Sequence, residues 1–230
     1  MGDRFVGPPD EPDRIRLVSS VHRGSEGEVF RGSLLSDASS GEGTVVDVAV
    51  KRLSPDLDRV EWLDRWHAQR RLLDELHAAD QSLRIVRVID LFQGPAPHRR
   101  RHAGQDRSTY LLSDWIPGRR FDDWSADPAV GFEERRSTLG QLSGTVAGLH
   151  RCGVIHRDLS PGNVIVDRAG RPTLIDFGIA VRCPENGWVH ESAPIGTDGF
   201  RSPEATDGHW SMAADRFALD RLVGLAMPPT

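Results

Sequence analysis

One stretch in the second half of the chain constrains the fold more than any other. Residues 154–178 read VIHRDLSPGNVIVDRAGRPTLIDFG. The apolar runs NVIV and TLID flank DRAG, a turn-forming tetrapeptide, and this arrangement predicts a β-hairpin whose turn is centred between Ala169 and Gly170. The expected cross-strand pairs are then Val166 with Thr173, Val164 with Ile175, and Asn163 with Asp176.

The open end of this hairpin carries side chains with oxygen donors. Asn163 offers an amide oxygen and Asp176 a carboxylate, which are ligand types that Mg²⁺ accepts beside waters and substrate phosphates. Asp158, on the loop that enters the hairpin, would accept a proton from a hydroxyl aimed at a metal-bound phosphate. An Asp-Asn pair beside a turn is more often a local hydrogen-bonding device, so both interpretations are open at this point.

Composition predicts a folded protein with no overall basic field. The 230 residues are 38% hydrophobic, which suffices for a core in one large domain or two small ones. The net charge of -5 argues against a nucleic-acid partner, and we interpret the basic stretch HRRRH at 98–102 as a solvated loop. Cys152 and Cys183 lack the spacing of a zinc site or a disulfide framework.

The sequence shows no signal for export or membrane insertion. Its first ten residues, MGDRFVGPPD, contain neither a basic n-region nor an apolar h-region. Val6 stands where a myristoylation signal requires Ser or Thr. No apolar run approaches the length that crosses a bilayer. We therefore expect a cytoplasmic protein with no membrane partner.

The N-terminal half contains the only lysine of the chain, Lys51. The strand-like runs IRLVSSV and GEVFRG flank a turn with Gly24 and Gly27, and the β-branched run TVVDVAVKRL then carries the lysine. A lysine supplies a compact point charge, whereas an arginine supplies a planar fork. Lys51 is therefore either a group that a tight site needs or a chance survivor of an arginine-preferring coding bias.

Two amphipathic stretches predict helices, separated by the strand-like runs IVRVIDLF and TYLLSDWI. In the first, from about Pro55 to Leu76, the residues at helical spacing are Trp62, Trp66, Leu72, Leu73 and Leu76. In the second, over residues 133–151, the apolar face consists of Leu139, Leu142, Val146 and Leu149. Gly144 and Gly148 each cost this helix about 1 kcal/mol relative to Ala, so we expect close packing at both.

Six short motifs occur in the order in which one enzyme family carries them. Over nearly its whole length the chain resembles a eukaryotic-type serine/threonine protein kinase domain of the bacterial kind. GSEGEV looks like the glycine-rich loop, VAVK the phosphate-pairing strand, HRDLSPGN the catalytic loop and DFG the metal motif. GTDGFRSPE looks like the substrate-binding segment with the APE motif, and DRFALD contains the aspartate that anchors the catalytic loop.

The resemblance implies an α+β fold with two lobes. The N-lobe would be an antiparallel sheet with one helix, and the C-lobe would be mainly helical and shortened. The expected parts are a flexible N-terminal tail over 1–13, the N-lobe over 14–112, a hinge over 113–118 and the truncated C-lobe over 119–230. The chain ends at GLAMPPT, before several helices that family members carry. The apolar surface of the lower lobe would then be exposed, covered by a partner or a second copy, or packed differently.

The same resemblance assigns chemical roles. Lys51 would bind the α- and β-phosphates of ATP, and Asp158 would be the base that orients the substrate hydroxyl. Asn163 and Asp176 would hold Mg²⁺ or Mn²⁺. The other residues expected around the nucleotide are Gly24, Ser25, Gly27, Val29, Ala49 and Ser113, with Asp114 and Ile116 contributing backbone groups to adenine.

Further residues are implied in regulation and in structure. Arg157 would dock a phosphate carried by the activation loop, whose only hydroxyl over residues 179–195 is that of Ser192. Thr197 would contact the base from the substrate-binding segment. Glu204, of the APE motif, would pair with an arginine that family members carry further along, and Asp215 would anchor the catalytic loop.

Three positions depart from the family pattern. His22 replaces the first glycine of the glycine-rich loop. Gln69 stands where the family has a glutamate that pairs with the lysine, and Glu61 and Glu75 are alternative partners. Ser160 replaces a lysine near the γ-phosphate, which removes positive charge from the place where the transition state needs it.

We interpret the chain as a signalling protein kinase that transfers the γ-phosphoryl group of Mg-ATP to Ser or Thr hydroxyls of a protein or peptide substrate. Gln69 and Ser160 leave open a nucleotide-binding docking module that a partner completes. A third interpretation is the kinase-like component of a lanthipeptide synthetase, which the stretch DRFALDRLVGLAMPPT resembles.

Overall fold

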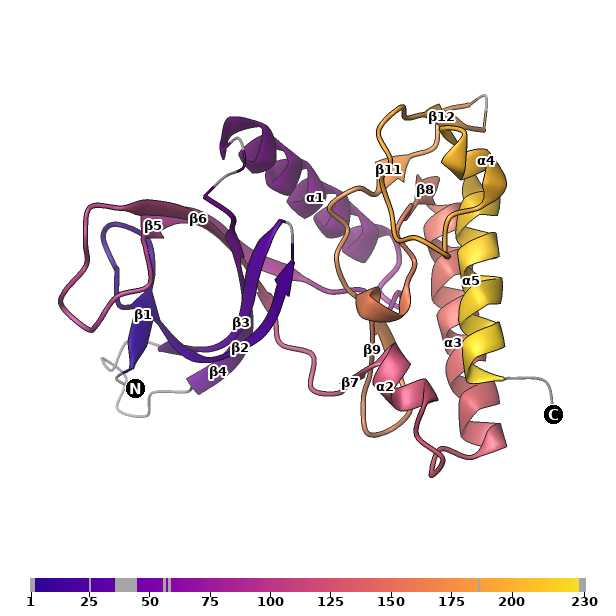
Figure 1. The fold of residues 1–230 in the computed structure, drawn as a ribbon, viewed down its shortest axis with the longest axis horizontal. Helices are drawn as coiled ribbons and strands as arrows, with labels where there is room; N and C mark the ends of the chain where they lie inside the picture. The colour runs from indigo at the N-terminus through magenta and orange to yellow at the C-terminus, as the bar shows by residue number, and fades with distance from the viewer. Residues whose placement is uncertain are drawn as a thin grey trace. The chain divides into compact units, whose positions relative to one another are not determined.

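The computed structural model describes residues 3–24, 26–35, 45–55, 57, 59–185 and 187–227. The chain divides into two compact units, the first made of residues 1–70 with 87–115 and the second of residues 71–86 with 116–230. Helix α1, Arg59–Ala79, contributes to both units. Figure 1 shows that strands dominate the first unit and helices the second. None of the described helices is both long and apolar enough to cross a membrane.

The first unit is built on an antiparallel sheet of six strands in the order β1-β2-β3-β4-β6-β5. Its strands are β1 Arg4–Val6, β2 Ile15–Gly24, β3 Gly27–Leu35, β4 Val45–Leu53, β5 Val88–Pro95 and β6 Arg107–Asp114. Figure 1 shows that this sheet is strongly curled. Its buried core includes Val6, Ile15, Val48, Val50, Tyr110 and Leu112. The antiparallel sheet expected from the sequence is therefore confirmed.

The N-terminal segment differs from the flexible tail expected over residues 1–13. Residues Arg4–Val6 form a strand that pairs with β2, and Val6 is fully buried. On the other side, Phe5 and His98 exchange two backbone hydrogen bonds, at 2.7 and 3.1 Å. The apolar pair Phe5-Val6 is too short to produce a periodic pattern, and the surrounding Pro, Gly and Asp residues favoured a tail.

Helix α1 buries one stripe of its surface. It extends beyond the C-terminal end expected from the sequence and reaches Ala79. The buried residues of the stripe are Trp66, Gln69, Leu73 and Leu76. They recur every three or four residues, which is the spacing of one helical face. Gln69 thus shares a face with apolar residues, whereas Trp62 and Leu72 are half-buried.

Besides the C-terminal part of α1, the second unit contains four helices in its described residues. They are α2 Phe121–Ser125, α3 Phe132–Arg151, α4 Pro203–Thr206 and α5 Met212–Ala226. The strands are β7 Arg119–Arg120, β8 Val154–Ile155, β9 Val164–Val166, β10 Pro172–Leu174, β11 Val181–Arg182, β12 Val189–His190 and β13 His209–Trp210. They form one three-stranded sheet, β10-β9-β7, and two pairs, β11-β8 and β12-β13.

Helix α3 confirms the helix expected over residues 133–151 and begins one residue earlier. Its expected apolar face is buried at Leu139, Leu142, Val146 and Leu149. A Cβ at Gly148 would lie 2.4 Å from Cδ2 of Leu83, so close packing explains this glycine. A Cβ at Gly144 would meet no atom within 4 Å, so the same explanation is wrong there.

The predicted hairpin is present as β9 and β10, but its register is shifted by one residue. Val166 pairs with Pro172 and not with Thr173. Asp167 explains the difference, because its backbone N–H donates to the carbonyl of Arg171 at 3.1 Å and its carboxylate accepts the N–H of Arg171 at 2.9 Å. These bonds close a loop with an odd number of residues, whereas the predicted turn has an even number.

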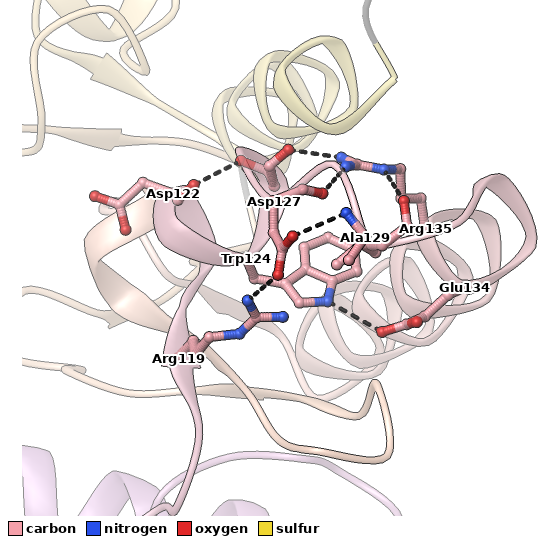
Figure 2. Close-up of polar contacts among 9 residues, drawn as sticks. Arg119, Asp122, Trp124, Asp127, Ala129, Glu134 and Arg135 are labelled. Atoms are coloured by element: carbon pink, nitrogen blue, oxygen red, sulfur yellow. Dashed lines mark hydrogen bonds and ion pairs between the residues drawn. The ribbon is translucent and has the colours of Figure 1, made fainter.

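Arg135, near the start of α3, binds the ends of several segments of the second unit (Figure 2). Its guanidinium nitrogens donate at 2.7 to 3.0 Å to the backbone carbonyls of Ser125, Asp127, Val130 and Ala226. Ser125 ends α2 and Ala226 ends α5, so one cation satisfies carbonyls at the C-termini of two helices. No motif in the sequence predicted this position.

Candidate active site

Asp158 lies at the centre of a polar cluster in the second unit. The Nδ2 of Asn163 donates to its Oδ2 at 2.7 Å and to its backbone carbonyl at 2.9 Å. The Oγ1 of Thr197 donates to its Oδ1 at 2.6 Å, which is the contact expected for Thr197. Because each carboxylate oxygen has its own donor, the carboxylate is held in one orientation.

Asp176 lies next to Asn163 at the open end of the hairpin. The N–H of Ile175 donates to the carbonyl of Asn163 at 2.9 Å, so the expected pairing of Asn163 with Asp176 was wrong by one residue. The backbone of Asp176 is left-handed, with φ 61°. Its Oδ1 accepts the N–H of Gly178 at 3.1 Å. Such a backbone costs about 1–3 kcal/mol, so the surrounding contacts must hold it in place.

The donor set of this pair fits a hard divalent cation. Since Asn163 directs its Nδ2 to Asp158, its amide oxygen is the atom left to face a metal. Asp176 adds carboxylate oxygen. Within the described ranges, no group of three or more His, Cys, Asp or Glu side chains could hold a metal ion. An amide and a carboxylate therefore fit an ion that keeps waters and shares phosphates, but not a closed zinc site.

A buried carboxylate holds the loop that precedes Asp158. Asp215, in the first turn of α5, accepts the N–H of His156 at 2.8 Å and that of Arg157 at 3.0 Å. A ring nitrogen of His150 lies 2.9 Å from the same carboxylate. Asp215 is only 1% exposed. These contacts are what the anchoring role expected of Asp215 requires.

His156 is fully buried, and its ring packs edge-on against Phe177 with centroids 4.6 Å apart. Desolvation lowers the pKa of its imidazole, although the carboxylates of Asp215, Asp158 and Asp176 act in the opposite direction. The neutral ring accepts the backbone N–H of Asp158 through Nδ1 at 3.3 Å. A neutral histidine therefore holds the backbone of Asp158 by a hydrogen bond.

Arg157 contacts two residues of the expected activation loop, over residues 179–195, and one residue of β13. Its Nε donates to the carbonyl of Ile179 at 2.6 Å, and its guanidinium lies 6.0 Å from the ring centroid of Trp210. Its Nη1 lies 3.8 Å from the carboxylate of Glu191. Glu191 directly precedes Ser192, the residue expected to carry a phosphate, and Ser192 is exposed. An acidic group thus already faces the arginine expected to receive that phosphate.

The glycine turn and the lone lysine lie in the first unit. Gly24 and Gly27 face each other at the end of the β2–β3 hairpin. A Cβ at Gly27 would lie 1.9 Å from the carbonyl oxygen of Arg52, so only glycine fits there. The Nζ of Lys51, on β4, lies 2.5 Å from the carboxylate of Glu26 in the turn. Glu26 was not predicted as a partner of Lys51.

Several of the other residues expected at the nucleotide lie on strands of the same six-stranded sheet. The cross-strand pairs are Val29 with Lys51 and Ala49 with Ser113. Asp114 ends β6, where its N–H donates to the carbonyl of Arg87 at 3.0 Å. The carboxylate of Asp114 accepts hydrogen bonds from the Arg87 guanidinium, which raise the pKa of that group. Ile116 begins the second unit, and Ser25 lies outside the described residues.

Comparison with known families identifies this arrangement. Residues 18–223 match the family model described as the protein kinase domain. The chain belongs to the protein kinase family. The matched range includes every residue from the glycine turn to Asp215, and the family uses ATP and a divalent metal ion.

Curated relatives of this kinase carry serine/threonine kinase names. It is 30% identical to probable serine/threonine-protein kinase PkwA of Thermomonospora curvata, with 95% of this chain and 27% of that protein aligned. It is 26% identical to serine/threonine-protein kinase D of Synechocystis sp., with 90% and 39% aligned. The kinase thus spans between about a quarter and two fifths of these relatives. Their names favour kinase function over the docking-module and lanthipeptide interpretations.

The structure also places four other residues that the resemblance singled out in this kinase. His22 lies on β2, cross-strand from Val29. Ser160 precedes the short 3₁₀ turn Pro161–Asn163 and is 4% exposed. Glu75, considered as a partner of Lys51, instead forms an ion pair with Arg182. Glu204 is exposed in α4, and no hydrogen bond or ion pair joins it to another residue in the described ranges.

Three partner residues of this kinase were not predicted: Glu26, His150 and Glu191. The two glutamates are each adjacent in sequence to a residue that was predicted, Gly27 or Ser192, so their charge was a usable signal. His150 offered no such signal, because its contact with Asp215 joins residues 65 positions apart.

Proposed function

We propose that this kinase transfers the γ-phosphoryl group of ATP to Ser or Thr hydroxyls of a protein or peptide substrate, with Mg²⁺ as its metal and in the cytoplasm. The observation that best supports this is the fixed carboxylate of Asp158. Asn163 and Thr197 donate to its two oxygens at 2.7 and 2.6 Å. A carboxylate fixed in this way suits a base that orients a hydroxyl.

In the proposed transfer, Asp158 receives the proton of the substrate hydroxyl. The hydroxyl oxygen forms a bond to the γ-phosphorus while the bond from that phosphorus to the bridging oxygen breaks, and ADP leaves with the electron pair. The hydroxyl of Thr197 at 2.6 Å supports this role, because a hydroxyl already fits against the carboxylate.

We propose that Asn163 and Asp176 bind the metal through the amide oxygen and the carboxylate. Mg²⁺ would neutralise charge on the phosphates. Asn163 would then have two tasks, since its Nδ2 orients Asp158 at 2.7 Å while its Oδ1 faces the metal. This arrangement would couple the orientation of the base to the presence of the ion.

For the nucleotide, Lys51 would exchange the carboxylate of Glu26 for the α- and β-phosphates, since both partners offer anionic oxygens. The turn between β2 and β3 would cover the phosphates with its backbone. The N–H of Asp114 already donates to Arg87, so the carbonyl of Asp114 is the group we propose for adenine. The remaining residues proposed to line the nucleotide are Gly24, Ser25, Gly27, Val29, Ala49, Ser113 and Ile116.

The test is transfer of labelled phosphate from [γ-³²P]ATP by the purified protein, to itself and to a generic basic protein. With Mg²⁺ present we expect label on Ser or Thr in phosphoamino-acid analysis, and loss of that label in Asp158→Asn. Parallel reactions with Mn²⁺ establish which metal supports the faster transfer. If the wild type binds ATP but transfers no label, the proposal is wrong.

A further inference from the structure

The catalytic turn of this kinase carries no positive charge of its own. Residues 158–163 read DLSPGN and thus supply the proposed base and one metal ligand but no Lys or Arg. Phosphoryl transfer places negative charge on the oxygens of the transferred group, and catalysis depends on neutralising it. A side-chain cation that acts at this turn, beside the proposed metal ion, therefore has to come from another segment.

The guanidinium of Arg120 lies against this turn. A Cβ built on Gly162 would lie 2.5 Å from Nη2 of Arg120 and 3.8 Å from Oγ of Ser160. The guanidinium and the serine hydroxyl thus flank the same point on the turn. Because Gly162 has no side chain, the guanidinium has room to approach the backbone there.

The backbone of Arg120 is held by strand pairing, whereas its guanidinium group makes only a weak ion pair. Its backbone, on β7, pairs with Ile165 of β9, the strand that directly follows the turn. Its Nε lies 3.5 Å from the carboxylate of Asp122, and its side chain is 39% exposed. An ion pair of that length and exposure is weak. The guanidinium can therefore exchange Asp122 for a more highly charged anion while its backbone stays in place.

Two other guanidinium groups near Asp158 have carboxylate partners on the segment that follows the hairpin. Arg157 and Arg201 both line a pocket beside Asp158. Arg157 pairs with Glu191, and Arg201 pairs with the carboxylate of Asp198. The three atoms nearest to a Cβ built on Gly162 belong to Arg120 and Ser160, and not to Arg157 or Arg201.

We propose that Arg120 supplies the positive charge at the transferring phosphoryl group that Ser160 does not provide. This inference rests on the proposed kinase function. During transfer, the Nη groups donate hydrogen bonds to the non-bridging oxygens of the γ-phosphoryl group. The guanidinium remains protonated throughout, so the substrate proton still goes to Asp158. Its planar fork suits two phosphate oxygens at once.

The first experiment compares Arg120→Gln with Arg119→Gln. Arg119 is the neighbouring arginine on β7 and pairs with Asp127 at 2.5 Å (Figure 2), so it is a matched control for charge and position. We expect Arg120→Gln to lower kcat by about 10- to 100-fold with little change in KM for the protein substrate. The expected loss is smaller than the loss on removing one hydrogen-bond donor from a fully closed active site, which lowers kcat by about 10²- to 10³-fold. Arg119→Gln should stay within about twofold of the wild type.

A second experiment moves the charge instead of removing it. In the double variant Arg120→Gln with Ser160→Lys, a lysine from the turn itself should restore most of the lost kcat. Binding without turnover provides an independent measurement, with ADP, Mg²⁺ and aluminium fluoride as a mimic of the transferring group. We expect Arg120→Gln to weaken binding of this mimic by at least about tenfold while its affinity for ADP alone is unchanged.

The outcomes separate this inference from the proposed function. An unchanged kcat in Arg120→Gln, beside a strong loss in Asp158→Asn, would overturn the inference and leave the kinase function standing. A change confined to KM for acidic peptides would also overturn it, because Arg120 would then bind substrate. If the wild type transfers no phosphate, the kinase function itself fails. Thermal unfolding checks each variant, and Arg120→Lys, which should keep part of the activity, replaces Arg120→Gln if that variant does not fold.

Discussion

Two residues of the site, Arg157 and Asp176, have left-handed backbones with φ of 67° and 61°. Neither is glycine, so each conformation costs free energy that other contacts must offset. For Arg157 these contacts are the Asp215 carboxylate, which accepts its N–H at 3.0 Å, and the Ile179 carbonyl, which accepts its Nε at 2.6 Å. The strained residues flank the hairpin and orient the groups proposed to carry the chemistry.

The buried imidazole of His156 predicts how stability changes with pH. Burial lowers its pKa from the ordinary value of 6.5, so below that value the unfolded chain binds a proton that the folded chain excludes. The contribution of the neutral His156 ring to the free energy of unfolding is therefore fully present above pH 6.5. It is lost as the pH falls toward the pKa of His156 in the folded protein. Urea unfolding should give a lower free energy of unfolding at pH 5.5 than at pH 7.5. In His156→Gln the difference in free energy of unfolding between the two pH values should become smaller, whereas in His102→Gln, which changes an exposed histidine, it should stay the same. The same difference in the wild type and in both variants would refute the prediction.

The ion pair of Arg157 with Glu191 suggests how phosphorylation of the expected activation loop would act. We propose phosphorylation of Ser192, where about -1.5 to -2 units of charge would compete with Glu191 for the guanidinium at 3.8 Å. Phosphopeptide mapping of active protein should find phosphate on Ser192. Ser192→Ala should keep basal activity, because Glu191 already faces Arg157. An unmodified Ser192 in fully active protein would contradict this proposal.

At the scale of elements, periodic segments were predictable and short ones were not. Helix α3 was predicted almost to the residue, because its apolar positions repeat over five turns. Strand β1, Arg4–Val6, is too short to show a period. The hairpin was predicted but its register was not, because the Asp167 carboxylate sets the loop length through its bonds to Arg171. Side-chain geometry of this kind has no signature in a hydrophobic pattern.

Helix α3 contains two glycines whose substitution should have opposite effects. At Gly144 an added Cβ meets open space, so Gly144→Ala should raise the free energy of unfolding by about 1 kcal/mol. At Gly148 the Cβ would lie 2.4 Å from the buried side chain of Leu83, and Gly148→Ala should lower stability by roughly 1–3 kcal/mol. Denaturant unfolding of both variants tests this, and equal effects would contradict the packing argument.

Adjacent arginines on α3 offer a second matched pair. Arg135 donates to four backbone carbonyls, so Arg135→Gln leaves several of them without a partner and should cost about 2–3 kcal/mol. Arg136 pairs with Glu133 and is 70% exposed, so Arg136→Gln should cost less than about 0.5 kcal/mol. A similar loss in both variants, measured by urea unfolding, would show that the carbonyl network around Arg135 contributes little.

At the scale of the whole molecule, the family match extends over residues 18–223 and the proposed roles are divided between two units. Lys51 and the glycine turn belong to the first unit, and Asp158 with the proposed metal ligands belongs to the second. The sequence was sufficient to predict these residues, because each lies in a short motif. It predicted the contact of Thr197 with Asp158 but not that of Glu26 with Lys51, because the latter depends on how the strands pair.

The proposed function depends above all on Asp158 acting as the base of phosphoryl transfer. The most direct test is the single-turnover rate of transfer from Mg-ATP in the wild type and in Asp158→Asn, with ATP affinity measured on the same samples. We predict that the rate falls by about 10²- to 10⁴-fold while the affinity for ATP is nearly unchanged. A rate within about threefold of the wild type, at equal ATP affinity, would show that Asp158 is not the base.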